Sequence, residues 1–185
     1  MSVSDEELML AYARGDAAAF ETLYGRHRAP LFGFVLRSAR TRGEAEELFQ
    51  DIWMRAIEAR MRYQPTARFT TWLYTIAHNR LVDHWRAKGL SLVSLDAHDD
   101  DDGPAIDPPA PPSAEPHEVV LAARSRDRLV AAIGALPLAQ REAFLLHAEG
   151  GLSVAEIAQA TGSNVEAAKS RLRYAMNKLH EAIDE

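Results

Sequence analysis

Apolar residues recur at three- and four-residue steps through four stretches of the first 90 residues. This spacing is typical of amphipathic helices, and it predicts helices over 4–14, from 16 onward, over 44–59 and over 68–88. Pro30 interrupts the second pattern, which resumes directly after it. Because proline removes a helical hydrogen bond, we expect a break there. No segment shows the alternation of a strand, so these elements predict a compact helical domain.

Local start and stop signals delimit these helices. Ser4 and Glu7 form a capping box, in which each side chain bonds the backbone amide of the other residue. Gly15 and the Thr-Arg-Gly sequence at 41–43 are typical of breaks between helices. The segment 60–71 is a short polar connection into the helix at 68–88.

A second helical region begins near Pro116. Its first apolar pattern ends at Pro137, which is well placed to start a further helix that runs to about His147. The pair Gly150-Gly151 indicates a turn after this helix.

The end of the chain predicts a helix-turn-helix, two helices joined by a short glycine-containing turn. Ser153 and Glu156 form a capping box, Gly162 ends the first helix, and Ser163 with Glu166 is expected to cap the second. The expected buried positions of the last helix are Val165, Ala168, Leu172, Met176 and Leu179. A structural αα-hairpin is the alternative, although the caps and the basic exposed face favour DNA binding.

The segment between the two helical regions has a different composition. It contains six prolines and the run Asp99–Asp102, and it has no Lys or Arg between Asp96 and Glu118. Such a sequence favours extended conformations over a packed core. We therefore predict an all-α fold of two small helical domains and a flexible acidic, proline-rich linker, with boundaries at 1–88, 89–116 and 117–185.

The charge of the chain is unevenly placed. The net charge is −6 at pH 7, but eight acids lie between Asp96 and Glu118, and the remaining residues carry a net charge of +2. From residue 60 to residue 88 the only acid is Asp83. A basic helix with amides, hydroxyls and aromatic rings suits nucleic acid, and taken alone it also suits an ordinary solvated face.

The predicted helix over 44–59 carries an acidic ridge of Glu44, Glu47 and Asp51, with Gln50 beside it. Like charges at this spacing destabilise an isolated helix, and a basic partner surface is one explanation for them. Solubility is the simpler explanation, and acids in a first turn also interact favourably with the helix dipole.

Three blocks in this order resemble the extracytoplasmic-function sigma factors of bacteria, members of the sigma-70 family. They are GEAEELFQDIWMRAIE at 43–58, FTTWLYTIAHNRLVDHWR at 69–86, and the longer block at 136–179 that begins LPLAQREAFLL. The resemblance implies a transcription initiation factor that binds core RNA polymerase, directs it to promoters and helps to melt the minus-ten element. The chain departs from many members of the family at Val165-Glu166-Ala167-Ala168, and this departure leaves the promoter base preference open.

The resemblance also implies partners and residue roles. The partners are the β′ clamp helices and the β flap of core RNA polymerase, promoter DNA and an anti-sigma factor. The resemblance assigns polymerase binding to Glu44, Glu47, Gln50 and Asp51. Minus-ten DNA contacts fall to Arg68, Asn79, Arg80, Asp83 and Arg86, whereas Trp72 is expected in the core. Minus-thirty-five contacts fall to Glu166, Lys169, Ser170, Arg171, Arg173 and Tyr174.

Other function classes are less well supported. The chain has no Cys, which excludes disulfides, Cys-ligated metals and thiol catalysis. None of the seven histidines forms a close metal-binding pair with a Glu, and no phosphate-cradling glycine loop is present, so we expect no enzyme, metal or cofactor. No secretion signal or membrane span is evident, so a cytoplasmic location is expected. A helix-turn-helix regulator that binds duplex DNA without polymerase is the main alternative function.

Overall fold

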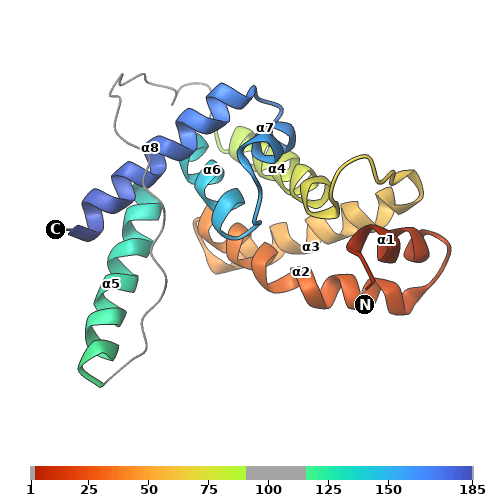
Figure 1. Cartoon of the computed structure of the whole chain (residues 1–185), viewed down its shortest axis with the longest axis horizontal. Coiled ribbons are helices and arrows are strands. Elements are labelled where there is room, and N and C mark those ends of the chain that lie inside the picture. Colours follow the sequence, from red (N-terminus) through yellow and green to blue (C-terminus); the bar gives the residue numbers. More distant parts are fainter. Residues whose placement is uncertain (1–2, 91–115, 185) are drawn as a thin grey trace.

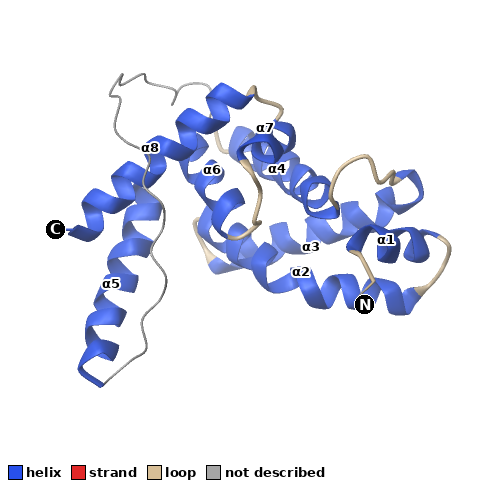
Figure 2. Cartoon of the chain, viewed as in Figure 1, coloured by secondary structure: helices blue, strands red, loops and turns tan. Residues whose placement is uncertain are grey.

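The computed structural model describes residues 3–90 and 116–184, which fold into helices joined by turns and loops (Figure 2). No strand occurs within these two ranges. The prediction of an all-α fold with two helical regions is confirmed. The interpretation of 89–116 as a flexible linker concerns residues that lie largely outside the described ranges.

The first module consists of four helices and a short 3₁₀ turn. Its elements are α1 (Asp5–Ala13), α2 (Ala17–Ser38), α3 (Arg42–Ala59), η1 (Arg60–Arg62) and α4 (Phe69–Ala87). The capping box of Ser4 and Glu7 is present at the start of α1. The Thr41 side chain accepts a hydrogen bond from the Glu44 amide at 3.2 Å, so α3 begins two residues earlier than predicted.

Helix α2 runs through Pro30, and the predicted break there is wrong. The missing hydrogen bond and the steric clash of an internal proline cost roughly 3 kcal/mol. Leu31, Phe34 and Val35, which follow the proline, are fully buried, and Leu23 before it is buried as well. Because each large apolar side chain contributes about 1.5–3 kcal/mol on full burial, the continuous apolar stripe outweighs the proline.

Aromatic side chains connect the helices of the first module. The Trp53 ring lies 5.8 Å from that of Phe20 and 5.1 Å from that of Tyr24, centroid to centroid. Trp72 is half-buried and packs edge-on against Tyr63, with the centroids 5.0 Å apart. Trp72 therefore contributes to packing, as expected from the sequence.

The second module consists of α5 (Pro116–Ala135), α6 (Leu138–Ala148), α7 (Val154–Thr161) and α8 (Val165–Asp184). The capping box of Ser153 and Glu156 is present at the start of α7. Gly162 ends α7 with φ of 64°, a left-handed conformation that glycine adopts without a steric penalty. Helices α7 and α8 thus form the predicted helix-turn-helix.

The start of α8 differs from the prediction by one residue. Asn164, rather than Ser163, accepts the hydrogen bond from the Ala167 amide, at 2.7 Å. The Ser163 amide instead bonds the Ala158 carbonyl and completes the end of α7. Val165 consequently lies in the first turn and is 49% exposed, so its predicted burial is wrong.

The two modules are packed against each other (Figure 1). Helix α7 lies across α4, and α6 lies against α2. Helix α8 in turn crosses α5 and α6 on the side of the second module away from α1. The helix predicted to contact the minus-ten strand is therefore covered along one side by the helix-turn-helix module.

Candidate nucleic-acid interface

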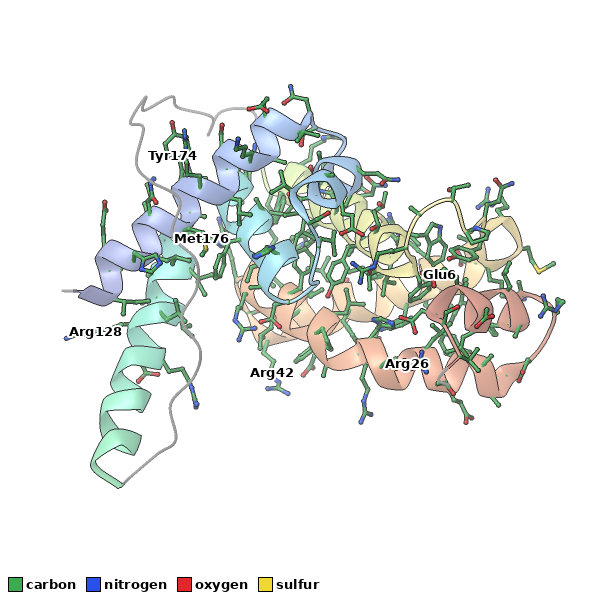
Figure 3. The ribbon with its side chains drawn as sticks, in the orientation of Figure 1. Glu6, Arg26, Arg42, Arg128, Tyr174 and Met176 are labelled. Atoms are coloured by element: carbon green, nitrogen blue, oxygen red, sulfur yellow. The ribbon has the colours of Figure 1, made fainter. Side chains whose placement is uncertain are left out.

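Helix α4 presents a polar face to solvent between α3 and the second module. The side chains of Asn79, Asp83 and Arg86 are exposed along it, at the spacing that the sequence predicts. The start of this helix has no cap of its own. Glu6 of α1 supplies one by accepting the Phe69 amide hydrogen bond at 2.7 Å, and Figure 3 shows Glu6 on α1 beside this region. Sequence reasoning missed Glu6, because a cap from another helix leaves no local pattern.

Arg80 is held by the acidic ridge of α3. Its Nε and Nη2 atoms lie 2.9 Å and 2.8 Å from Oδ2 of Asp51, and its side chain is only 15% exposed. The structure thus joins a predicted DNA-binding residue to a predicted polymerase-binding residue. In this conformation Arg80 is not available to a phosphate.

Two further ion pairs connect α3 to α4. Glu44 pairs with Lys88, and the hydrogen bond from Lys88 is the main cause that lowers the pKa of this carboxyl. Arg55 lies 3.3 Å from Asp83 at the solvent boundary. Partial burial and then the positive charge of Lys88 lower the pKa of the neighbouring His84. The neutral imidazole is therefore favoured beside this pair.

Glu47 and Gln50 are exposed on α3, and Glu47 lies beside the Glu44–Lys88 pair, where its charge acts on the neighbouring His84. Met54, one turn further along α3, is 54% exposed. An exposed methionine among polar groups is typical of the centre of a protein interface, where apolar side chains are surrounded by a polar rim. Sequence reasoning missed Met54, although its position four residues after Gln50 could have identified it.

Arg68 contacts the second module. Its Nη1 atom lies 3.3 Å from Oε1 of Glu156, and the buried Thr71 hydroxyl donates to the same oxygen at 3.3 Å. Burial raises the pKa of Glu156, but the hydrogen bonds from Ser153 and the charge of Arg68 outweigh it, and the pKa falls below its usual value. Glu156 thus has two functions, as a helix cap and as an inter-module contact.

Helix α8, which is predicted to contact the minus-thirty-five element, exposes its first turns. Glu166 and Lys169 are exposed, while Ser170 and Arg171 are partly buried. Further along, the Arg173 guanidinium lies 5.2 Å from the centroid of the Tyr174 ring. Figure 3 shows Tyr174 on the outer side of α8 and Met176 on the side toward α5. Because the Ser163 amide is occupied by Ala158, Glu166 does not cap it, which leaves this carboxylate for a ligand.

Sequence reasoning also missed a buried pair between the modules. Nδ1 of His78 in α4 donates to Oε1 of Glu142 in α6 at 2.6 Å, and the two side chains are 10% and 4% exposed. A second contact joins Arg37 of α2 to Glu149 at 2.6 Å. Helical periodicity relates residues within one helix, so it could not predict contacts between residues of different modules.

Within the described ranges, no cluster of three or more His, Cys, Asp or Glu side chains could hold a metal ion. None of the described helices is long and apolar enough to cross a bilayer.

Two protein-family models match the chain. Sigma-70 region 2 matches residues 23–90, and Sigma-70, region 4 matches residues 126–179. The first match contains most of α2, together with α3 and α4, and the second contains α6 and α7 and most of α8. Both candidate DNA-facing helices thus lie in matched regions.

Curated relatives match along nearly the whole chain. The chain is 32% identical over 177 residues to the ECF RNA polymerase sigma factor SigK of Mycobacterium sp. strain KMS, which covers 95% of this chain and 89% of the relative. It is 33% identical over 186 residues to the RNA polymerase sigma factor CarQ of Myxococcus xanthus, with 96% of each chain covered.

Solved structures share the fold. CnrH in complex with the cytosolic domain of CnrY matches with a TM-score of 0.67 and 24% identity, over 97% of each chain. The sigma factor RpoE of Bartonella quintana, in complex with the anti-sigma factor NepR, matches with a TM-score of 0.65 and 24% identity, over 89% of this chain and 96% of that one.

Proposed function

Because the chain belongs to the extracytoplasmic-function group of sigma-70 factors, we propose that α3 docks it on core RNA polymerase while α4 and α8 contact the promoter. The observation that carries the proposal is the pair of exposed polar helix faces, one in each matched region, together with an acidic surface on α3. Promoter recognition by RNA polymerase is the function of this family, and the chain acts without catalysis of its own. An anti-sigma factor is a further proposed partner, and the cytoplasm is the proposed location.

The docking surface on α3 is proposed to centre on Met54. Glu47 and Gln50 lie beside it and form a polar rim, which suits a basic partner. Asp51 and Glu44 are already paired with Arg80 and Lys88, so they support the surface and contribute less charge to a partner. This refines the four-residue ridge predicted from the sequence.

Helix α4 is proposed to hold the separated minus-ten strand. Amide, carboxylate and guanidinium groups at Asn79, Asp83 and Arg86 can bond exposed base edges and phosphates. Reading a strand as it opens requires bases to leave the stack, which favours a site with both polar and cationic groups. Arg68 and Arg80 can join this site only after their carboxylate partners release them.

Helix α8 is proposed to read the minus-thirty-five element in the major groove. In a helix-turn-helix the first turns of the second helix reach base edges, and here those turns carry Glu166, Lys169 and Ser170. Glu166 can accept from a cytosine amine, and Lys169 or Arg173 can bind guanine or phosphate. Arg171 and Tyr174 are proposed to contact the backbone, which positions the helix without specifying sequence.

The alternative, a duplex-binding regulator that does not use polymerase, is less well supported. It explains α8 but gives no role to the α3 surface or to the polar face of α4. The similarity to sigma factors also extends through both modules rather than through the helix-turn-helix alone.

Transcription by core polymerase and this chain on a promoter library tests the proposal. We expect defined start sites that require both promoter elements. Glu47→Lys with Gln50→Lys should weaken core binding by about tenfold or more, because a like charge facing a basic surface costs several kcal/mol. The matched control places lysines at Glu21 and Glu181, two exposed acids outside the proposed surfaces. Specific duplex binding without core binding would support the alternative.

A further inference from the structure

A cavity of about 290 Å³ lies where the ends of α2 and α4 meet the start of α6. Its lining includes three cationic side chains, Arg40, Lys88 and Arg141. None of the described residues that line it is a carboxylate. In a chain with a net charge of −6, a cavity lined by cations without acids is a local reversal of charge that suits an anion.

A second cavity, of about 560 Å³, adjoins the first, because Arg40 and Arg141 line both. Its lining adds a third arginine, Arg37, and again includes no carboxylate among the described residues. The exposed side chains of Leu36 and Val130 lie at its wall. Small-molecule pockets have volumes of roughly 300–1,000 Å³, so the adjoining cavities together have the size of a ligand site.

The two shared arginines have no charge partner. Within the described part of the chain no carboxylate pairs with the Arg40 or Arg141 side chain, whereas Arg37 and Lys88 each have an ion pair. Nη2 of Arg141 donates to the Leu136 carbonyl at 3.0 Å, and its Nε atom is buried without a hydrogen-bond partner. Burial lowers the pKa of Arg141, as expected for a charge without a counterion. A bound anion would supply the missing charge.

The wall beside these arginines is apolar. Trp85 and Leu136 are buried and line the smaller cavity, with Leu138 next to them. An anion that fills this space therefore needs an apolar or aromatic body. Arginine forks match phosphate and carboxylate oxygens, and a phosphate ester carries a charge of about −1.5 to −2 at pH 7. A phosphate thus matches two unpaired guanidinium groups better than a carboxylate does.

We propose that the adjoining cavities bind a small organic phosphate, with the phosphate between Arg40 and Arg141 and an apolar or aromatic body against Trp85. The site is separate from the proposed polymerase and promoter surfaces. Its occupancy can be measured with neither polymerase nor promoter DNA present, so the result does not depend on the proposed function. Because a ligand that binds the folded chain stabilises it, the melting temperature should rise with ligand concentration.

Calorimetric titration of the full chain tests the ligand class. The probes are AMP and naphthyl phosphate, which carry a phosphate on a polar and on an apolar ring system, and their parts adenosine, naphthol and inorganic phosphate. At least one ester should bind about tenfold more tightly than either of its parts, because both parts contact the site together. The ester that binds more tightly identifies the polarity of the body. Equal affinity of the ester and its parts, or no binding of either ester, would overturn the proposal.

A matched pair of charge reversals tests the role of the unpaired arginines. Arg40→Glu should weaken binding of the ester by about tenfold or more, since like charges then face each other, and Arg40→Lys should retain most of the affinity. The control is Arg28→Glu, an exposed arginine of the same helix α2 that lines neither cavity. Melting of the free variants checks that each is folded. Equal weakening by Arg28→Glu and Arg40→Glu would show a diffuse charge effect and reject the site.

The three tryptophans report the location of the ligand. Trp85 lines the smaller cavity, whereas Trp53 and Trp72 line neither cavity. In an NMR titration the indole N–H signal that is absent from Trp85→Phe should shift with the ester, and the other two should stay in place. A shift confined to Trp53 or Trp72 would contradict the proposed position. Displacement of the ester by duplex DNA of arbitrary sequence would assign the two arginines to a nucleic-acid backbone instead and would also overturn the proposal.

Discussion

The two sides of α4 hold their ion pairs in different environments. Toward α3, Arg80–Asp51 and Arg55–Asp83 lie at the solvent boundary, where at least one partner of each pair is more than 40% exposed. Toward α6, His78 and Glu142 are almost completely buried. Exposed pairs contribute about 0–1 kcal/mol and exchange partners readily. A buried pair adds little net stability over an apolar equivalent, but removal of one member is costly.

This difference suggests a division of roles. Residues in the pairs toward α3 can exchange their partners for groups of polymerase or DNA at a small cost in free energy. They therefore suit a surface that changes its contacts. The pair toward α6 resists replacement by water as long as the modules stay docked. It therefore acts as a specific latch, and the comparison can be tested by removing members of each pair in turn.

The largest effect is expected from Glu142→Ala. It leaves the buried His78 nitrogen without its acceptor, which should lower the free energy of unfolding by about 1–3 kcal/mol. Urea unfolding followed by circular dichroism measures this. The paired replacement His78→Leu with Glu142→Leu should be close to neutral, because apolar side chains of similar size substitute well for a buried pair. A loss below about 0.5 kcal/mol in the alanine variant would show that the pair is not a latch.

A smaller effect is expected from Arg80→Ala on the other side of the helix. Asp51 is 45% exposed, so water replaces its lost partner, and the free energy of unfolding should fall by no more than about 1 kcal/mol. Asp51→Asn should have a similarly small effect on stability. The rate of promoter opening should distinguish the two variants. Arg80→Ala removes a proposed phosphate contact, whereas Asp51→Asn frees Arg80 to make that contact. Equal loss of opening in both variants would instead assign the pair a purely structural role.

Sequence reasoning succeeds where the interacting residues are close together in the chain, and it fails where they are far apart. The capping boxes at Ser4 and Ser153 were predictable because both partners lie three residues apart. The cap of α8 was misplaced because Ser163 and Asn164 are both good caps, and only the bond from Ser163 to the end of α7 decides between them. Pro30 was misjudged because burial on both sides of it is a tertiary effect.

The candidate site shows the same limit. The exposed face of α4 follows from helical periodicity, and the sequence predicts it. The α3–α4 pairs, the Glu6 cap and the docking of α7 on Arg68 join residues between 28 and 88 positions apart, and no local pattern encodes them. Sequence reasoning thus indicates which side chains could contact DNA. The structure adds which of them are already engaged by the protein itself.

The smallest effect on stability, and the sharpest test of the polar face, is expected from Asp83→Asn. The pair with Arg55 is long, at 3.3 Å, and its side chains are 44% and 53% exposed, so unfolding should change by less than about 0.5 kcal/mol. Asparagine keeps the shape but loses the charge.

If Asp83 accepts from a base amine, preference at one position of the minus-ten element should fall while other positions keep theirs. If the carboxylate only offsets the charge of Arg55, its loss should strengthen binding to all sequences about equally and steepen the salt dependence, because one more phosphate is neutralised. We expect the first result, since Asn79 and Arg86 lie on the same exposed face and can hold the strand in place. Selection from a pool of pre-melted promoters at two salt concentrations separates the two, and a uniform gain would remove Asp83 from the reading residues.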